Sequence, residues 1–192
     1  MYYEVEVQSH VRVPPGKFSQ DTKESILASI KERYDGIVTK DLGAVIGVID
    51  VTKIGEGVII PGDGAAYYDT VFTLLTFKPE MQEMILGKIS DITDFGAFMD
   101  MGALDGMIHI SQTMDDFVSF SKSTVLTGKE SKRTLKVGDK CRARIIAVSF
   151  KEAGNPKIGL TMRQSRLGNL QWIDEELKKE SGQALEKKGK EK

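Results

Sequence analysis

The chain has 192 residues, of which 40% are hydrophobic and 29% are charged. This composition suits one large or two small globular domains with their own cores. The single cysteine, Cys141, cannot form an internal disulfide, and with only two histidines beside it the chain lacks the ligands of a usual structural zinc site. No stretch is apolar enough to span a membrane, and the first residues alternate in polarity where a signal peptide would be continuously apolar. We therefore expect a cytoplasmic protein without membrane contact.

The net charge of −1 hides an uneven distribution. Residues 1–84 carry 8 basic and 13 acidic side chains, whereas residues 85–170 carry 13 basic and 9 acidic ones. This change of sign indicates two modules with different partners, the second suited to a polyanion.

The first third of the chain predicts a small antiparallel sheet with one helix. Polarity alternates from Tyr3 to Val13, as in a half-buried strand. A helix is expected from about Ser19 to Tyr34, because Asp21 and Glu24 are spaced as in a capping box and apolar residues follow at helical spacing.

Two further strands are expected at Ala44–Val51 and Tyr67–Phe77. The first is almost continuously apolar and β-branched, which favours a central strand covered on both faces. The glycine-rich segment Gly55–Gly64 between them carries three consecutive aliphatic residues, Val58, Ile59 and Ile60. From pattern alone it is either a projecting loop that docks on a partner or an ordinary hairpin connection, and the second reading is favoured.

Pro79 marks a boundary, because proline cannot pair within a central strand. We expect a first domain at residues 1–80, a second at 81–167, a short amphipathic segment at 168–180 and a disordered tail at 181–192. Glycine turns divide Gly87–Ser111 into three short strands, and Lys140–Val148 and Lys157–Arg163 add two more. Five such strands match an OB-fold barrel.

Strand alternation divides the last two strands of this barrel into two faces. It places Cys141, Ala143, Ile145 and Ala147 inward, and Lys140, Arg142 and Arg144 outward. On the last strand, Lys157 and Arg163 point outward. Such a basic stripe can follow a phosphate backbone, and a solvated charged face is the plainer alternative.

Aromatic residues lie near this stripe. Phe95 and Phe98 are three residues apart, so a regular strand would place them on opposite faces, but a bend or bulge at Gly96 could bring both outward as a stacking platform for bases. Pattern alone leaves it even whether one of them belongs to the core. His109 faces away from its apolar neighbours and either contacts RNA or has a structural role.

No arrangement in the sequence supports catalysis, and we predict no catalytic residue, metal or cofactor. No nucleophile has a motif around it, and the aspartates of the C-terminal half alternate with apolar residues as solvent-facing positions would. These aspartates are Asp91, Asp94, Asp100 and Asp105.

The strings Gly87–Ser111, Val137–Asp139 and Ile158–Met162 together resemble the S-one type RNA-binding domain, an OB-fold. The stretch Gln112–Lys136, about 25 residues long, separates strands that are usually closer in such domains. By this resemblance and the strand alternation, the expected RNA-binding residues are Lys88, Phe95, Phe98, His109, Lys140, Arg142, Arg144, Lys157 and Arg163.

Further motifs resemble the large stalk component of archaeal RNA polymerase, its E-prime subunit, which is the counterpart of the seventh subunit of eukaryotic RNA polymerase II. The strings that carry this resemblance include Ile59–Tyr68, Thr76–Glu80, Met114–Asp116, Gly128–Arg133 and Thr161–Gln164.

The resemblance implies a truncated RNP-like N-terminal domain, with an antiparallel sheet and a helix, ahead of a five-stranded OB-fold. Its projecting loop would dock on the polymerase core through Val58, Ile59, Ile60, Pro61, Gly62, Asp63 and Gly64. It further implies a heterodimer with the smaller stalk component, the polymerase F subunit. Binding of nascent single-stranded RNA and assistance to promoter opening, processivity and termination are also implied, with no catalytic site in this chain.

Two alternatives rest on the C-terminal half alone. The OB-fold motifs also suit a free-standing RNA-binding protein of translation or RNA decay. A nuclease has only the scattered aspartates in its favour.

Overall fold

The computed structural model describes residues 1–19, 21–121, 125–152 and 154–189, with residues 180–189 described by their backbone alone. The chain divides into two units, Met1–Pro79 with Phe150–Pro156, and Glu80–Ser149 with Lys157–Lys192. Among the described residues, no helix has the length and apolar character needed to cross a membrane.

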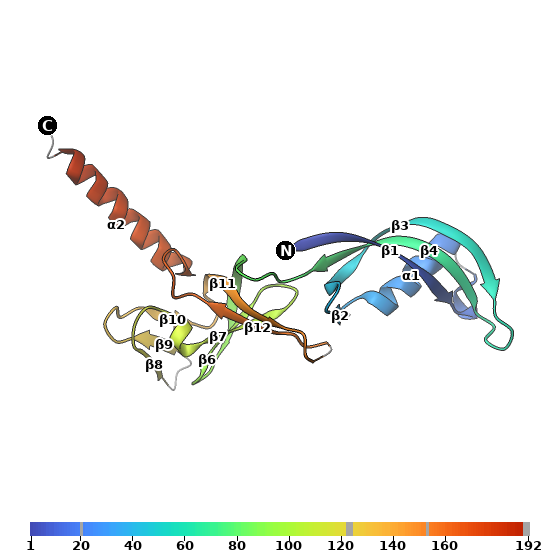
Figure 1. Ribbon diagram of the computed structural model, residues 1–192, viewed down its shortest axis with the longest axis horizontal. Helices are drawn as coiled ribbons and strands as arrows, with labels where there is room; N and C mark the ends of the chain where they lie inside the picture. The colour runs from blue at the N-terminus through green and yellow to red at the C-terminus, as the bar shows by residue number, and fades with distance from the viewer. Residues whose placement is uncertain (20, 122–124, 153, 190–192) are drawn as a thin grey trace. The chain divides into compact units, whose positions relative to one another are not determined.

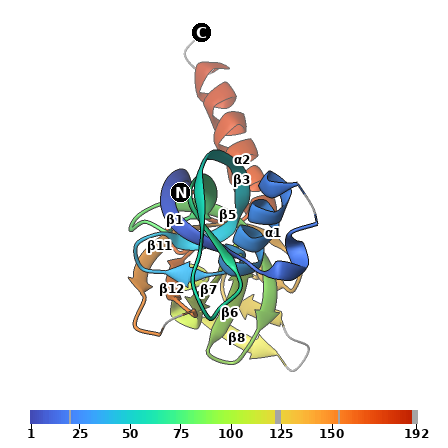
Figure 2. The same ribbon diagram turned by 90° about the vertical axis from the view of Figure 1, so that its right-hand side faces the viewer.

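The N-terminal unit is a four-stranded antiparallel sheet with one helix. The strands lie in the order β1-β4-β3-β2, and their bounds are Tyr2–Val13 for β1, Val38–Thr39 for β2, Gly43–Ile59 for β3 and Ala66–Phe77 for β4. A short 3-10 turn, η1 at Pro15–Lys17, leads to helix α1 at Thr22–Tyr34. Figures 1 and 2 show α1 on one side of the curved sheet, where it contacts β1 and β3. This confirms the predicted architecture.

Helix α1 begins three residues later than predicted. The carboxylate of Asp21 accepts a hydrogen bond from the amide of Lys23 at 3.1 Å, which makes Asp21 the N-cap and leaves Ser19 outside the helix. Ile26 and Ile30 are fully buried against the sheet, so the predicted apolar stripe is confirmed.

Strand β3 is not covered on both faces, contrary to the prediction for Ala44–Val51. Ile46 and Ile49 are 42% and 49% exposed. The pairing with β4 has four bulges, and each adds one residue to β3, so one residue in three faces the helix instead of one in two. The inward residues are Val45, Val48, Val51 and Ile54.

The C-terminal unit is a closed five-stranded barrel, as the OB-fold prediction requires. Its strands are β5 at Met84–Ile92, β6 at Gly96–Asp100, β7 at Asp105–His109, β11 at Lys140–Ser149 and β12 at Lys157–Thr161. They lie in the order β12-β7-β6-β5-β11, with a short β13 at Gly168–Asn169 beside β11. Pairing of β12 with β11 closes the barrel, and the β12–β7 pair is parallel.

Strand alternation predicts the barrel interior correctly with one exception. Cys141, Ala143 and Ile145 are fully buried, and Ile158, Leu160 and Met162 are at most 2% exposed. Ala147, which was expected inside, is exposed. A bulge between Ile145 and Ala147 shifts the alternation by one residue.

A three-stranded sheet is inserted between β7 and β11, within the stretch 112–136. It consists of β8 at Val118–Ser121, β9 at Val125–Gly128 and β10 at Thr134–Lys136, in the order β10-β9-β8, and a 3-10 turn, η2 at Ile110–Gln112, leads into it. The sequence gives no prediction for this sheet.

Asp116 joins the two ends of the insertion. Its carboxylate accepts hydrogen bonds from the backbone amides of Phe117, Glu130 and Ser131 and from the Ser131 hydroxyl, at 2.6 to 3.3 Å. These bonds, with that from the Ser131 amide as the largest cause, lower the pKa of Asp116. Gly128 leaves room for this arrangement, because a β-carbon there would lie 2.4 Å from a carboxylate oxygen of Asp116.

Helix α2 runs from Leu170 to Gly189. Its first turns attach to the insertion: Arg133 forms a 2.7 Å ion pair with Glu176, and its guanidinium lies 5.5 Å from the ring centre of Trp172. The helix includes residues 181–189 of the stretch predicted to be disordered, while residues 190–192 lie outside the described residues. Disorder of this tail stays a prediction.

Candidate nucleic-acid interface and docking tip

Phe95 and Phe98 lie next to each other on the outside of the barrel. Their ring centroids are 6.0 Å apart with an interplanar angle of 87°. In β6, Ala97 and Met99 are fully buried, so alternation turns Phe98 outward. Phe95 precedes the strand in a turn closed by backbone hydrogen bonds between Thr93 and Gly96. The turn, and not a bulge at Gly96, brings both rings to the outer face.

Gly96 allows β6 to pass closely over β7. A β-carbon at this position would lie 2.1 Å from the carbonyl oxygen of Ile108. Gly96 pairs with His109 across the two strands, so this exposed imidazole lies on the same face as Phe98. We call Phe95, Phe98 and His109 the aromatic face.

The hydrogen bonds of His109 fix its neutral tautomer. The Ser111 amide donates to Nδ1 at 3.3 Å, and the Ser111 hydroxyl lies 2.8 Å from the same nitrogen. Because Nδ1 accepts from the backbone, the neutral ring carries its proton on Nε2. His109 can therefore donate one hydrogen bond to a base or a phosphate.

Lys88 and Lys140 lie one step along the sheet from the aromatic face. They are cross-strand partners on β5 and β11, and both are exposed. Lys88 also pairs with Asp100 of β6, two residues beyond Phe98 on the same side of that strand. These two lysines are therefore the basic residues that the register places beside Phe98.

Arg142 and Arg144 lie farther from the aromatic rings. They pair with Leu86 and Met84 at the start of β5, whereas Phe98 pairs with Asp91 near its end. Both arginines are half-buried, and Nη1 of Arg142 lies 3.5 Å from the carbonyl oxygen of Arg166. Nε of Arg144 is buried without a hydrogen-bond partner among the described residues. The register thus separates them from the aromatic residues with which the sequence groups them.

Lys157 and Arg163 lie at opposite ends of β12. Lys157 is its first residue and is exposed, whereas Arg163 follows its end and forms a 2.9 Å ion pair with Asp115. Of the nine candidate residues, the register collects five, Lys88, Phe95, Phe98, His109 and Lys140, on adjoining strands.

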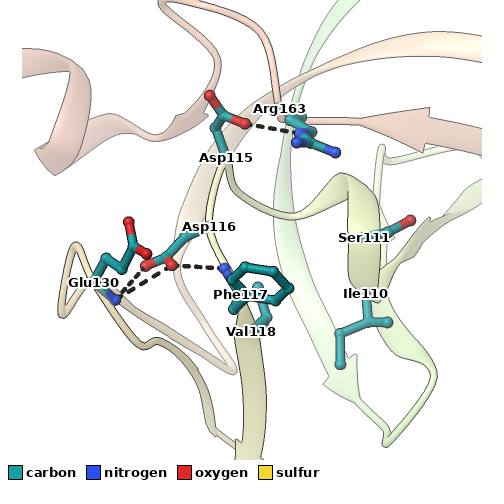
Figure 3. A pocket seen from close by; sticks show the side chains of 8 residues that line it. All are labelled: Ile110, Ser111, Asp115, Asp116, Phe117, Val118, Glu130 and Arg163. Atoms are coloured by element: carbon teal, nitrogen blue, oxygen red, sulfur yellow. Dashed lines mark hydrogen bonds and ion pairs between the residues drawn. The ribbon is translucent and has the colours of Figure 1, made fainter.

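Figure 3 shows a groove that the sequence does not predict. It lies where the insertion meets the barrel, and its volume is about 420 Å³. Ile110 and Ser111 line one side, and Phe117 and Val118 line the other. Phe117 is 76% exposed, and the only signal for it in the sequence is an aromatic residue beside the acidic pair Asp115–Asp116.

The expected docking residues lie at the end of the β3–β4 hairpin. Strand β3 continues to Ile59, and β4 begins at Ala66, so the first half of the predicted loop Gly55–Gly64 is a strand. Figure 1 shows the hairpin extending beyond α1 to its turn. Val58, Ile59 and Ile60 are 60%, 64% and 48% exposed. We call Val58–Gly64 the docking tip.

Asp63 connects the docking tip to the strands beside it. Its carboxylate forms an ion pair with Arg12 at 2.6 Å and accepts a hydrogen bond from the Tyr67 hydroxyl. The hydrogen bond from Arg12, followed by that from Tyr67, lowers the pKa of Asp63 well below its usual range, and the Asp63 carboxylate raises the pKa of Tyr67. The turn is thus held by a charge-assisted network despite its exposure.

Within the described residues, no three His, Cys, Asp or Glu side chains come together as metal ligands. The aromatic face with its neighbouring lysines offers rings and cations, and the docking tip offers an exposed apolar turn. Both surfaces suit the binding of a partner.

Two domain families match the chain. Residues 8–64 match the SHS2 domain found in the N terminus of Rpb7p/Rpc25p/MJ0397, and residues 78–154 match the S1 RNA binding domain. These matches and the fold define the class, in which an Rpb7-type N-terminal domain precedes an RNA-binding barrel. The chain is 37% identical to DNA-directed RNA polymerase subunit Rpo7 of Saccharolobus solfataricus over 175 residues, which cover 90% of this chain and 97% of that protein. The chain belongs to the Rpo7 family of RNA polymerase subunits.

Two more distant relatives show how far the similarity extends. RNA polymerase III subunit RPC8 of Bos taurus is 24% identical over 157 residues, which cover 78% of this chain and 77% of that protein. Ribonuclease R of Buchnera aphidicola is 36% identical over 92 residues, which cover 46% of this chain and 12% of that protein. Similarity to the polymerase subunits therefore spans most of the chain, whereas similarity to the nuclease spans less than half.

Proposed function

We propose that this chain is an RNA-binding arm fixed to RNA polymerase. It is a non-catalytic stalk subunit of the enzyme, as its membership of the Rpo7 family implies. The single observation that carries the proposal is the match to 97% of an archaeal Rpo7, which includes both the domain with the docking tip and the RNA-binding barrel.

The RNA path runs over the aromatic face in this proposal. Bases of nascent single-stranded RNA stack on Phe95 and Phe98, and His109 donates a hydrogen bond from Nε2. Lys88 and Lys140 lie where they can neutralise phosphates beside these bases. Arg142, Arg144, Lys157 and Arg163 supply positive charge farther around the barrel.

The docking tip is the anchor to the polymerase core. Three adjacent aliphatic side chains at the tip are about half exposed or more. Exposure of this apolar surface to water is unfavourable in free energy, and its burial against a partner is favourable. We further propose that the smaller polymerase F subunit binds this chain, that the pair assists promoter opening, processivity and termination, and that the complex works in the cytoplasm.

The alternative, a free-standing RNA-binding protein of translation or RNA decay, is not favoured. It accounts for the barrel but leaves the N-terminal domain and its exposed tip without a role.

Affinity purification of the tagged chain from cells tests the proposal. We expect the polymerase core and the F subunit to co-purify, and a chain carrying Ile59→Ser and Ile60→Ser to lose the core while keeping its fold. Co-purification with ribosomes or nucleases instead of polymerase would contradict the proposal.

A further inference from the structure

The groove between the insertion and the barrel adjoins the aromatic face. The amide of Ile110 donates a hydrogen bond to the carbonyl oxygen of Phe95 at 2.9 Å, and Ser111 bonds to His109. Residues that line the groove are thus bonded directly to two members of the aromatic face. The groove therefore adjoins the face over which the RNA path is proposed to run.

The backbone of Phe117 is hydrogen-bonded at both its amide and its carbonyl, and its ring is exposed. Its amide donates to Asp116 at 2.6 Å, and its carbonyl oxygen accepts from the amide of Lys129 at 2.9 Å. Because this backbone is already fixed, stacking of a planar ligand on the ring costs side-chain freedom alone, and a phenylalanine has only two rotatable side-chain bonds. An exposed phenylalanine otherwise gains nothing from contact with water.

The charges in the groove favour a base over a phosphate. Among the described residues that line it, Asp115, Asp116 and Glu130 are acidic, and Arg163 is the one basic residue, already paired with Asp115. Carboxylates repel phosphates but accept hydrogen bonds from the amino groups of bases. Asp116 is occupied by backbone donors and the Ser131 hydroxyl, which leaves the Glu130 carboxylate and the second oxygen of Asp115, whose Oδ1 binds Arg163, as acceptors at the groove.

We propose that this groove is a further base-binding subsite, in which Phe117 stacks on a base of single-stranded RNA that has crossed the aromatic face. The proposal rests on the proposed function, because it extends the same RNA path. A volume of about 420 Å³ falls within the range of about 300 to 1,000 Å³ typical of small-ligand sites. The insertion thereby lengthens the RNA path by a position that a barrel alone lacks.

Binding of a fluorescein-labelled, mixed-sequence single-stranded RNA of about 16 nucleotides to the full chain tests the subsite. We expect Phe117→Ala to weaken binding about fivefold or more, the lower end of the effect of losing one stacked base. Phe120→Ala is the matched control, because Phe120 is an exposed phenylalanine on β8 that does not line the groove. Thermal unfolding of both variants checks that the fold is intact.

A second measurement detects stacking directly. Trp replaces Phe117 or Phe120, and its fluorescence is followed as unlabelled RNA is added. Both variants also contain the native Trp172, so Phe120→Trp gives the background change. We expect RNA to quench the fluorescence of Phe117→Trp more strongly than that of Phe120→Trp. Native affinity in Phe117→Ala, or no additional quenching in Phe117→Trp, overturns the subsite. If Phe95→Ala with Phe98→Ala weakens binding while the Phe117 variants behave as native, the subsite alone fails; if the native chain binds no RNA, the RNA-binding role fails with it.

Discussion

Arg12 and Asp63 form a two-point contact across the docking tip: Nε donates to one carboxylate oxygen at 2.9 Å and Nη2 to the other at 2.6 Å. The contact joins the end of β1 to the turn between β3 and β4, 51 residues later in the chain. Bidentate geometry restricts the angle as well as the distance. The ion pair therefore sets the direction in which the tip projects.

Asp63→Asn should loosen the tip without unfolding the domain. Both side chains are partly exposed, so the melting temperature should change little. Amide hydrogen exchange should become faster at residues 60–65, and affinity for the polymerase core should fall. Asp50→Asn, which removes the exposed Lys23–Asp50 pair, is the matched control and should leave exchange at the tip unchanged.

The same pair predicts the behaviour of the tip in acid. Because the pKa of Asp63 is lowered from 3.8 in the folded chain, the contribution of the pair is present above the unfolded pKa and is lost only as the pH falls through the lower, folded value. Protection of the tip amides, measured relative to their intrinsic exchange rate at each pH, should thus persist at pH 4 and be lost in more acidic solution. A loss of protection centred on pH 4 would show that the pair does not form in solution.

Replacing Ile59 and Ile60 by serine should weaken binding to the polymerase core. Full burial of an exposed isoleucine is worth about 1.5 to 3 kcal/mol, and about half of each side chain is still exposed, so we expect a loss of roughly tenfold or more for the pair. Ile49→Ser is the control, since Ile49 lies on the same sheet and is as exposed as Ile60. Equal loss in the control would assign core binding to the sheet and not to the tip. Quantitative pull-down with purified core provides the measurement.

Phe95→Ala with Phe98→Ala should weaken RNA binding by roughly 1 to 3 kcal/mol for each base that no longer stacks. The dependence of affinity on salt should not change, because no cation is removed. Anisotropy titrations at several salt concentrations measure both quantities. An unchanged affinity would exclude the aromatic face from the RNA path.

Lys88→Gln with Lys140→Gln should instead flatten the salt dependence, by a slope of roughly 0.7 for each phosphate that is no longer neutralised. The basic stripe predicted from the sequence also contains Arg142 and Arg144, so their double variant is the natural comparison. If the lysine pair has the larger effect, phosphates lie beside Phe98. Native slopes in both variants would contradict the assignment of this face to RNA.

Gly96→Ala should destabilise the barrel by roughly 1 to 3 kcal/mol, because the new methyl group collides with a backbone carbonyl that cannot move aside. Gly47→Ala is the control, since its methyl group would meet nothing within 4 Å. Thermal unfolding of both variants measures the difference. Similar melting temperatures would mean that β6 and β7 are farther apart than the structure shows.

The sequence predicts those elements whose alternation is regular. β1, α1 and the interior of the barrel follow from periods of two and 3.6, and the bulge before Ala147 is where the alternation predicted for β11 fails. β3 could not be predicted in this way, because its bulges depend on pairing with β4 and leave no local signal. The insertion is also hidden, since its strands are only three or four residues long.

The candidate RNA-binding residues are likewise predicted only in part. Alternation turns Phe98, Lys88 and Lys140 outward, but only the register between strands decides which outward residues become neighbours. The sequence thus groups Arg142 with Phe98, although their partners lie at opposite ends of β5. Phe117 is missed because its place depends on Asp116 joining segments 14 and 15 residues apart.

The bulges of β3 restrict which changes in length the N-terminal domain tolerates. A 17-residue strand lies against a 12-residue one, and its inward residues recur every third position. Loss of one residue from β3 would move every later side chain off the helix-facing side, whereas loss of three would remove one repeat and keep the rest in phase. Among natural variants of this hairpin, its reach should therefore change in steps of three residues of β3 together with two of β4.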